Sequence, residues 1–259
     1  MYAFLFKKSF FDLWDNLWFI IFLNLALVLS LLIPLAVFAL LPSGGSGALK
    51  ILLLLISVVC FFSGLGASAE LSRAMTDYKH PSFSSLPGAL RSSFPSSLAF
   101  AAFWGVYLFI LRYVFLFYQS VTSPWGAVGL MVLLWVTLFL LLISLFYFPV
   151  MARLERKTGK IIKKSLLLFL DNPGFSFVLL SGVVILGAVS VLTAFLFPGP
   201  GGMLIWLSTG LKLRLYKYEY RDNPEYGKEE PIPWERLFQE EKELLGKRTF
   251  KGLVFPWKD

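Results

Sequence analysis

The chain has 259 residues, of which 57% are apolar and only 15% charged, and its mean hydropathy is +0.72. Because a typical soluble domain carries about 25% charged residues, this composition excludes a soluble globular protein and indicates an integral membrane protein. The net charge of +8 would suit nucleic-acid binding only if the basic residues shared a soluble face, and the single cysteine excludes an internal disulfide.

The chain opens with an aromatic segment and continues as apolar runs separated by turns. Residues 1–16 contain Phe and Trp side chains that suit the headgroup region, so we expect an interfacial helix there. A helix needs about 20 mostly apolar residues to cross a bilayer. Five runs meet that length and a sixth is short, which predicts spans at 17–41, 51–69, 98–117, 127–150, 175–197 and 201–216.

The distribution of positive charge supports six spans. Lys and Arg accumulate in cytoplasmic loops, and placing the N-terminus inside puts 22 of the 24 basic residues on the cytoplasmic side. A five-span arrangement would leave the basic C-terminal region outside. We therefore expect an all-α polytopic membrane helix bundle over residues 1–216, with both termini cytoplasmic, and a cytoplasmic tail over 217–259.

Two further cytoplasmic segments show helical spacing of apolar residues. Phe83, Leu86, Leu90 and Phe94 lie in a Ser- and Pro-rich loop, where they predict a short amphipathic helix on the membrane surface. In the tail, residues 233–246 place Trp234, Leu237, Phe238, Leu244 and Leu245 on one face. This pattern predicts an amphipathic helix of about three turns.

The loop between the fourth and fifth predicted spans carries the densest positive charge. Six basic residues follow steps of three and four, which predicts one basic face on an amphipathic helix. Its position directly after a span favours anionic lipid headgroups as the partner, at about 1 kcal/mol per basic residue, and disfavours nucleic acid. The six residues are Arg153, Arg156, Lys157, Lys160, Lys163 and Lys164.

Polar residues inside predicted spans are the first candidates for function, because they are costly in a bilayer. Asn24, in the first span, either bonds neighbouring helices or lines a cavity, and we favour the helix contact. Arg112, in the third span, lies about 9 Å from its outer end. Its side chain either extends to the outer interface or forms a buried contact.

The end of the second span collects small residues before two charges. Gly64 and Ser68 form a small-xxx-small pair that lets helices approach closely. Glu70 and Arg73 lie three residues apart and can pair with each other. We expect a tight helix junction with an ion pair, and we name Glu70 as the first candidate for a conformational or proton-linked site.

The sequence offers no catalytic or metal-binding constellation. His80 is the single histidine, has no second His or Cys pair at metal-ligand spacing, and is expected in a surface loop. Cys60 is expected to be a small buried apolar residue. We predict no enzyme activity, no cofactor and no bound metal.

Three stretches give the chain a resemblance to a known family. They are "LWDNLWFIIFLNLALVLSLLIPL", the segment "LSRAMTDYKHPSFSSLPGALRSSF" after the small-residue span, and "YFPVMARLERKTGKIIKKSLLLFLDNPGFSFVLL". Together they resemble the YesL-type family of bacterial membrane proteins over roughly residues 10–215. The resemblance implies a bacterial inner-membrane protein, often encoded beside sugar-import systems, and it supplies no catalytic residues.

Two functional hypotheses follow. The first is a non-enzymatic accessory protein that binds a membrane partner, such as a carbohydrate ABC importer, through its cytoplasmic amphipathic segments. The second is a small-solute transporter or channel, motivated by Asn24, Glu70, Arg112 and the interrupted region between the fifth and sixth predicted spans. A polar cavity reaching Glu70 or Arg112 would favour transport, whereas a solidly packed bundle would favour the accessory function.

Overall fold

The computed structural model describes residues 1–40, 47–222, 232–246 and 248, and this part of the chain is built from helices and turns without a strand. Residues 41–46, around the end of the first predicted span, and much of the predicted tail lie outside the described residues. The helices are α1 (Tyr2–Asp15), α2 (Leu17–Leu40), α3 (Gly47–Thr76), η1 (Phe83–Ser85), α4 (Leu86–Ser120), α5 (Pro124–Ser144), α6 (Tyr147–Arg153), α7 (Thr158–Asp171), α8 (Pro173–Leu192), α9 (Gly199–Asp222), α10 (Trp234–Leu237) and α11 (Gln239–Leu245).

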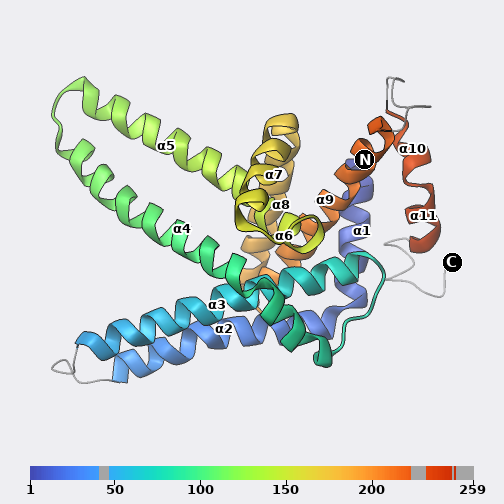
Figure 1. Cartoon of the computed structure of the whole chain (residues 1–259), viewed down its shortest axis with the longest axis horizontal. Helices are drawn as coiled ribbons and strands as arrows, with labels where there is room; N and C mark the ends of the chain where they lie inside the picture. The colour runs from blue at the N-terminus through green and yellow to red at the C-terminus, as the bar shows by residue number, and fades with distance from the viewer. Residues whose placement is uncertain (41–46, 223–231, 247, 249–259) are drawn as a thin grey trace.

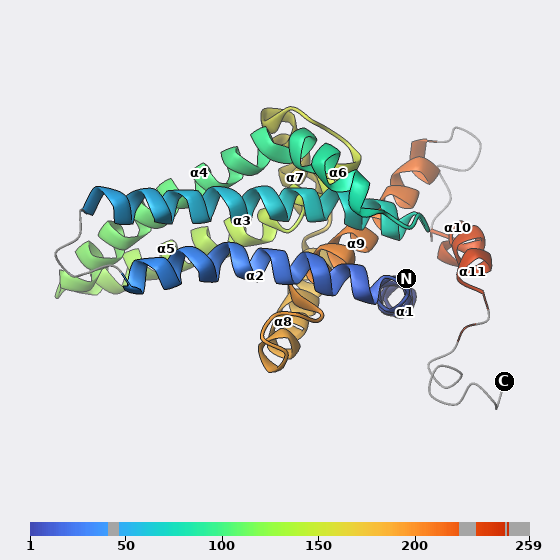
Figure 2. The ribbon, with the colours of Figure 1, turned by 90° about the horizontal axis from the view of Figure 1, so that it is seen from below.

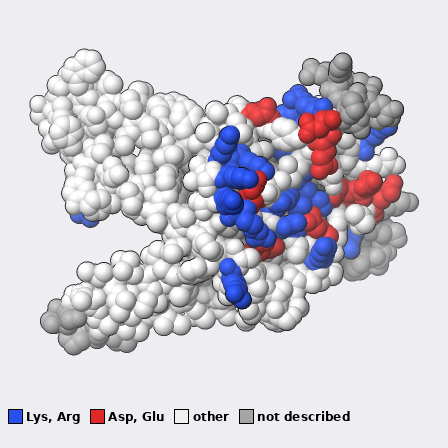
Figure 3. Space-filling model, in the orientation of Figure 1, with Lys and Arg blue, Asp and Glu red and all other residues white. Residues whose placement is uncertain are grey.

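Four long helices form two arms. Helices α2 and α3 lie along each other as the first arm, and α4 and α5 form the second; α3 and α4 join the arms at their base (Figure 1). The arms diverge towards their tips, and the space-filling view shows a hollow between them (Figure 3). Large apolar side chains such as Leu32, Ile51 and Phe109 are exposed along the arms. Helices that expose apolar residues in this way suit lipid or a membrane partner.

Helix α9 lies at the centre of the fold. It packs against α1, α2, α3, α6 and α8, and residues from Leu204 to Leu211 are buried along it. Helix α8 packs antiparallel to α9, because Gly182 and Gly210 allow close contact with Trp206 and Leu179 respectively. Figure 2 shows that α8 runs across the direction of α2 and α3 instead of along it.

Five of the predicted spans correspond to helices that are long and apolar enough to cross a membrane. These are Leu17–Ala39, Gly47–Thr76, Phe83–Ser120, Pro124–Arg153 and Pro173–Leu192. The sixth predicted span lies within α9, which is not among them. The continuous helix α9 also passes through the predicted domain boundary at residue 216 and ends at Asp222.

Two segments expected on the cytoplasmic side differ from their predicted form. The amphipathic segment that begins at Phe83 is not a separate helix, because η1 leads directly into α4 and the helix continues through Pro95 to Ser120. The predicted tail helix at 233–246 is present as two short helices, α10 and α11. Phe238 is buried at their junction, as its position on the apolar face predicts, whereas Leu244 is exposed.

Charged residues gather at one end of the molecule. Figure 3 shows Lys, Arg, Asp and Glu side chains clustered beyond the base of the arms, while the arms are almost free of charge on the visible face. Helices α1, α10 and α11 lie at this same end (Figure 1). We call it the charged end.

Candidate functional site

A buried cluster of ion pairs joins helices at the charged end. The Nζ atom of Lys8 on α1 lies 3.3 Å from Asp12 and 3.3 Å from Glu241 on α11. The Nζ atom of Lys212 on α9 lies 2.6 Å from Glu241 and 3.1 Å from Asp77, which directly follows α3. Lys8 is fully buried, and Asp12 and Glu241 are 4% and 3% exposed. We call these five residues the buried ion-pair cluster.

Both carboxylate oxygens of Glu241 are fully engaged. The Tyr78 hydroxyl donates to Oε2 at 3.0 Å, and the Tyr216 hydroxyl donates to Oε1 at 2.7 Å. The Lys8 ammonium also lies 3.8 Å from the ring centroid of Tyr78, within the range of a cation–π contact. Glu241 therefore holds α11 against three other parts of the chain.

The cluster is balanced in charge. Arg153 of α6 adds a third cation, since its guanidinium nitrogens lie 3.0 and 3.2 Å from the two Asp77 oxygens. Three cations thus face three carboxylates at short range, and Arg73 lies at the edge of the cluster, 4.0 Å from Asp77. Buried pairs of this kind add little net stability, but removing one partner leaves an uncompensated buried charge. The arrangement is chemically suited to fastening helices together, because it leaves no spare charge for an ionic ligand.

The two buried carboxylates differ in their pKa values. Burial raises the pKa of Asp12 from 3.8 to about 6, against the opposing effect of Lys8 and Lys212. Burial also acts to raise the pKa of Glu241, but Lys8, Lys212 and the Tyr216 hydroxyl outweigh it and hold that pKa below its ordinary value. Glu241 is therefore the carboxylate that the cluster is built to keep ionised.

Sequence reasoning missed this cluster, although two signals point towards it. Lys8 and Asp12 are four residues apart in an aromatic helix, so they share one face. Glu241 lies three residues after Phe238 and four before Leu245, which places a carboxylate on the predicted apolar face of the tail helix. A charged residue on an apolar face indicates a buried partner.

The predicted pair between Glu70 and Arg73 is wrong. Glu70 forms its ion pair with Arg156, whose second nitrogen Nη2 lies 3.2 Å from Glu70 Oε2. Arg73 instead donates to the backbone carbonyl of Ala152 at 2.7 Å. Both residues therefore tie α3 to the segment around α6, because long side chains on an interfacial helix end can reach neighbouring elements as easily as each other.

The small residues before Glu70 form the predicted tight junction. A side chain at Gly66 would overlap Ser93 and Ser97 of α4, and one at Gly64 would overlap Leu27 of α2. Ser68 is 1% exposed. This stretch of α3 thus brings both arms together at their base.

Asn24 bonds both the turn before α9 and the first turn of α9 itself, so it makes the helix contact that the sequence favours. Its amide nitrogen donates to the carbonyls of Leu196 and Pro198 at 2.9 and 2.8 Å, and its oxygen accepts from the Gly201 N–H at 2.8 Å. Asn24 is fully buried. It therefore satisfies two backbone carbonyls of the turn between α8 and α9 and one N–H in the first turn of α9.

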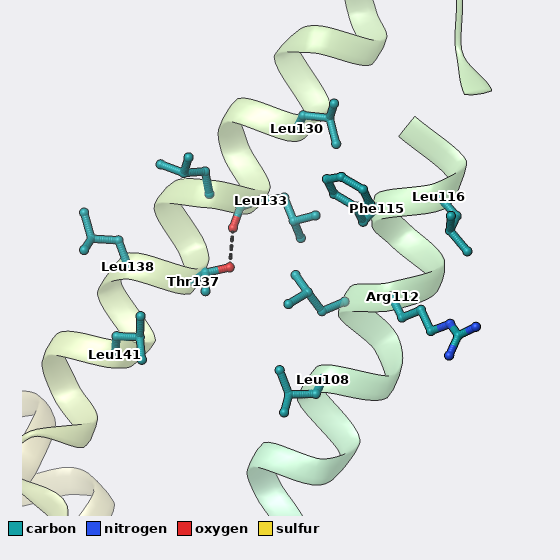
Figure 4. Close-up of a pocket in the computed structure, with 11 residues that line it drawn as sticks. Leu108, Arg112, Phe115, Leu116, Leu130, Leu133, Thr137, Leu138 and Leu141 are labelled. Carbon is teal, nitrogen blue, oxygen red and sulfur yellow. Dashed lines mark hydrogen bonds between the residues drawn. The ribbon is translucent and has the colours of Figure 1, made fainter. Parts of the chain in front are cut away.

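Arg112 lines the flank of an open apolar pocket between α4 and α5. The pocket has a volume of about 780 Å³ and is lined mainly by leucines, with Arg112 and Thr137 as its polar residues. Thr137 donates to the Leu133 carbonyl, whereas Arg112 points away from α5 (Figure 4). Arg112 is exposed, so it does not reach Glu70 or any polar cavity in the described part of the protein.

The predicted basic helix is interrupted. Helix α6 ends at Arg153 and α7 begins at Thr158, so residues 154–157 form a turn and the six basic residues do not share one helical face. The Ser96 hydroxyl donates to the Arg156 carbonyl at 3.2 Å and holds this turn. Arg153 pairs with Asp77 directly after α3, Arg156 pairs with Glu70 on α3, and Lys164 lies 2.9 Å from Glu155. Lys157, Lys160 and Lys163 have no ion-pair partner among the described residues.

The remaining chemical candidates contribute little. Cys60 is exposed on α3, so its prediction as a buried residue is wrong, and His80 is exposed in the loop after α3. Among the residues that the structure describes, no three His, Cys, Asp or Glu side chains could hold a metal ion together. Comparison of the chain with protein families, characterised proteins and solved structures found no match.

Proposed function

We propose that this protein is a non-enzymatic membrane interaction protein, whose charged end is a rigid platform and whose two arms receive the membrane helices of a partner. The observation that carries the proposal is the commitment of its polar residues to internal contacts. The side-chain amide of Asn24 forms its hydrogen bonds with backbone groups around the start of α9, and Glu70 forms an ion pair with Arg156. The arms, in contrast, diverge around a hollow (Figure 3) and expose apolar side chains along their length.

The alternative function, transport of a small solute, loses two of its candidate residues. A transporter places its site near the middle of the membrane, often at interrupted helices. Asn24 binds the interrupted region between α8 and α9, and the pocket at Arg112 is open and lined mainly by apolar residues. Only Arg112 still supports the transport hypothesis.

The topology that we propose keeps both termini on the cytoplasmic side of a bacterial inner membrane, with four full crossings by α2, α3, α4 and α5. Helices α8 and α9 form a hairpin that turns inside the membrane. The depth of Asn24 along α2 supports this hairpin. Asn24 lies seven residues after Leu17, the first residue of α2, which is about 10 Å along a helix of roughly 36 Å. The turn that Asn24 binds is therefore expected within the membrane and short of its far side. Irregular backbone at membrane depth requires partners from the protein, and Asn24 and Ser190 supply them.

Cysteine labelling tests this topology. In a Cys60→Ser background, a cysteine at Val121, between α4 and α5, reacts with an impermeant maleimide added outside, whereas a cysteine at Ala194, between α8 and α9, does not. Labelling of Ala194→Cys from outside would establish six full crossings and reject the partial hairpin.

The partner that we propose is an importer of the carbohydrate ABC class, because members of the YesL-type family, which this chain resembles, are often encoded beside sugar-import systems. Purification under mild detergent from native membranes tests it. The supporting result is co-purification of the importer's membrane subunits; recovery of the protein alone in every growth condition would reject the interaction function.

A further inference from the structure

The charged end contains a second feature, which adjoins the buried ion-pair cluster at Arg153 and is independent of the proposed function. A pocket of about 340 Å³ opens between α3, the end of α6, the turn at 154–157 and the start of α7. Its lining includes five basic side chains and one carboxylate. The basic residues are Arg73, Arg153, Arg156, Lys157 and Lys160. We call this cavity the basic pocket.

The charges in the basic pocket are not balanced. Arg153 and Arg156 are paired with Asp77 and Glu70, and the carboxylate of Glu155 is taken by Lys164. Lys157 and Lys160 form no ion pair with a carboxylate in the described part of the chain, although both lie close enough to Glu155 to help lower its pKa, and Arg73 has only a long contact of 4.0 Å with Asp77. Excess positive charge around a cavity favours an anion.

The guanidinium groups are held in place before any ligand arrives. Arg73 donates to the Ala152 carbonyl at 2.7 Å, and Arg156 is fixed by Glu70. The Ser96 hydroxyl also holds the 154–157 turn in place, because it donates a hydrogen bond to the Arg156 carbonyl. Ordered guanidinium forks match the geometry of phosphate oxygens, and the flexible lysines can close around the same group as point charges.

The position of the basic pocket in the fold indicates which kind of anion it meets. Ser96 lies on α4 immediately before the apolar stretch that starts at Leu98, and the Tyr147 hydroxyl donates to the Ser96 carbonyl at 2.7 Å. The pocket therefore lies at the level where the apolar arms begin. This is the level of lipid phosphates, and basic pockets at this level bind anionic headgroups.

We propose that the basic pocket binds a phosphate group, presented by the headgroup of an anionic phospholipid. This goes beyond a diffuse attraction of basic residues to the membrane, because it assigns binding to particular side chains. Lipid binding by diffuse attraction would depend on the number of basic residues near the membrane. Binding in the pocket depends instead on the positions of particular basic side chains.

The experiment compares two double variants with equal loss of charge. Lys157→Gln/Lys160→Gln removes the two unpaired lysines of the pocket, and Lys79→Gln/Lys163→Gln removes two lysines that do not line it. Purified full-length protein is titrated with short-chain phosphatidic acid in neutral detergent, and binding is followed by native mass spectrometry. Inorganic phosphate is titrated separately as a competitor.

The pocket variant is expected to bind phosphatidic acid at least tenfold more weakly, since each basic residue near an anionic surface contributes about 1 kcal/mol. The control variant is expected to bind as the wild type does. Competition by inorganic phosphate would assign recognition to the phosphate group itself; lipid binding without such competition would assign it to the whole headgroup. Equal weakening in both variants, or no saturable binding in the wild type, would overturn the proposal.

Discussion

Replacing Glu241 by Gln perturbs the buried ion-pair cluster with almost no change in side-chain volume. The substitution leaves the fully buried Lys8 with Asp12 as its remaining carboxylate partner, and leaves Lys212 with Asp77. Breaking a buried pair costs about 3–5 kcal/mol. We expect the lower end, about 3 kcal/mol, because each lysine keeps one partner and the Gln oxygen can still accept from a tyrosine.

A loss of about 3 kcal/mol corresponds to a roughly hundredfold increase in the open population of α11. Hydrogen–deuterium exchange of the protein in nanodiscs measures this opening, because local unfolding exposes backbone amides. Amides of α11 are expected to exchange about a hundred times faster in Glu241→Gln. The matched control is Glu240→Gln, which changes the exposed neighbouring residue on the same helix. Equal exchange in both variants would refute the conclusion that Glu241 fastens α11.

Three other substitutions test separate parts of the structure. The pKa of Asp12 is raised to about 6, so the folded state binds this proton more tightly than the unfolded state does. The free energy of unfolding should therefore rise as pH falls from 7 to 5, and Asp12→Asn should remove this rise. A wild-type stability that falls over the same pH range would contradict the prediction. In a denaturant titration, Asn24→Ala should lower the free energy of unfolding by about 3 kcal/mol, because buried backbone groups lose their hydrogen-bond partner. The control Ser30→Ala should have little effect, because the Ser30 hydroxyl bonds only a carbonyl of its own helix. Gly66→Leu should lower the thermal unfolding midpoint by pushing α3 and α4 apart, and Gly88→Leu, which has open space, serves as its control; equal midpoints would show that the junction is not tight.

The sequence was sufficient to predict the helical membrane class and the approximate positions of the long helices. Length and hydropathy are properties of each segment alone, so five of the predicted spans correspond to helices of sufficient length and apolarity. The sixth predicted span lies within α9, whose residues are buried because other helices of the protein surround them. Hydropathy cannot distinguish burial in protein from burial in lipid.

Pairing of charges was harder to predict, because it depends on which helices meet. Spacing within one helix suggested that Glu70 pairs with Arg73, yet each bonds a residue about 80 positions further along. The same limit applies to Lys8 and Glu241, which are brought together by the docking of α11 on α1 and α9. The basic loop shows the opposite case, where tertiary contacts with α3 and α4 break a helix that periodicity alone predicts.

Site-specific photo-crosslinking in native membranes tests the proposed interaction most directly. A photoreactive residue replaces Leu116, which is exposed on α4 and lies beside Arg112 on the side away from α5 (Figure 4). The control position is Leu192, at the exposed end of α8 and outside both arms. The interaction function predicts a protein adduct of defined mass from Leu116 and none from Leu192. Lipid adducts alone at both positions would contradict it.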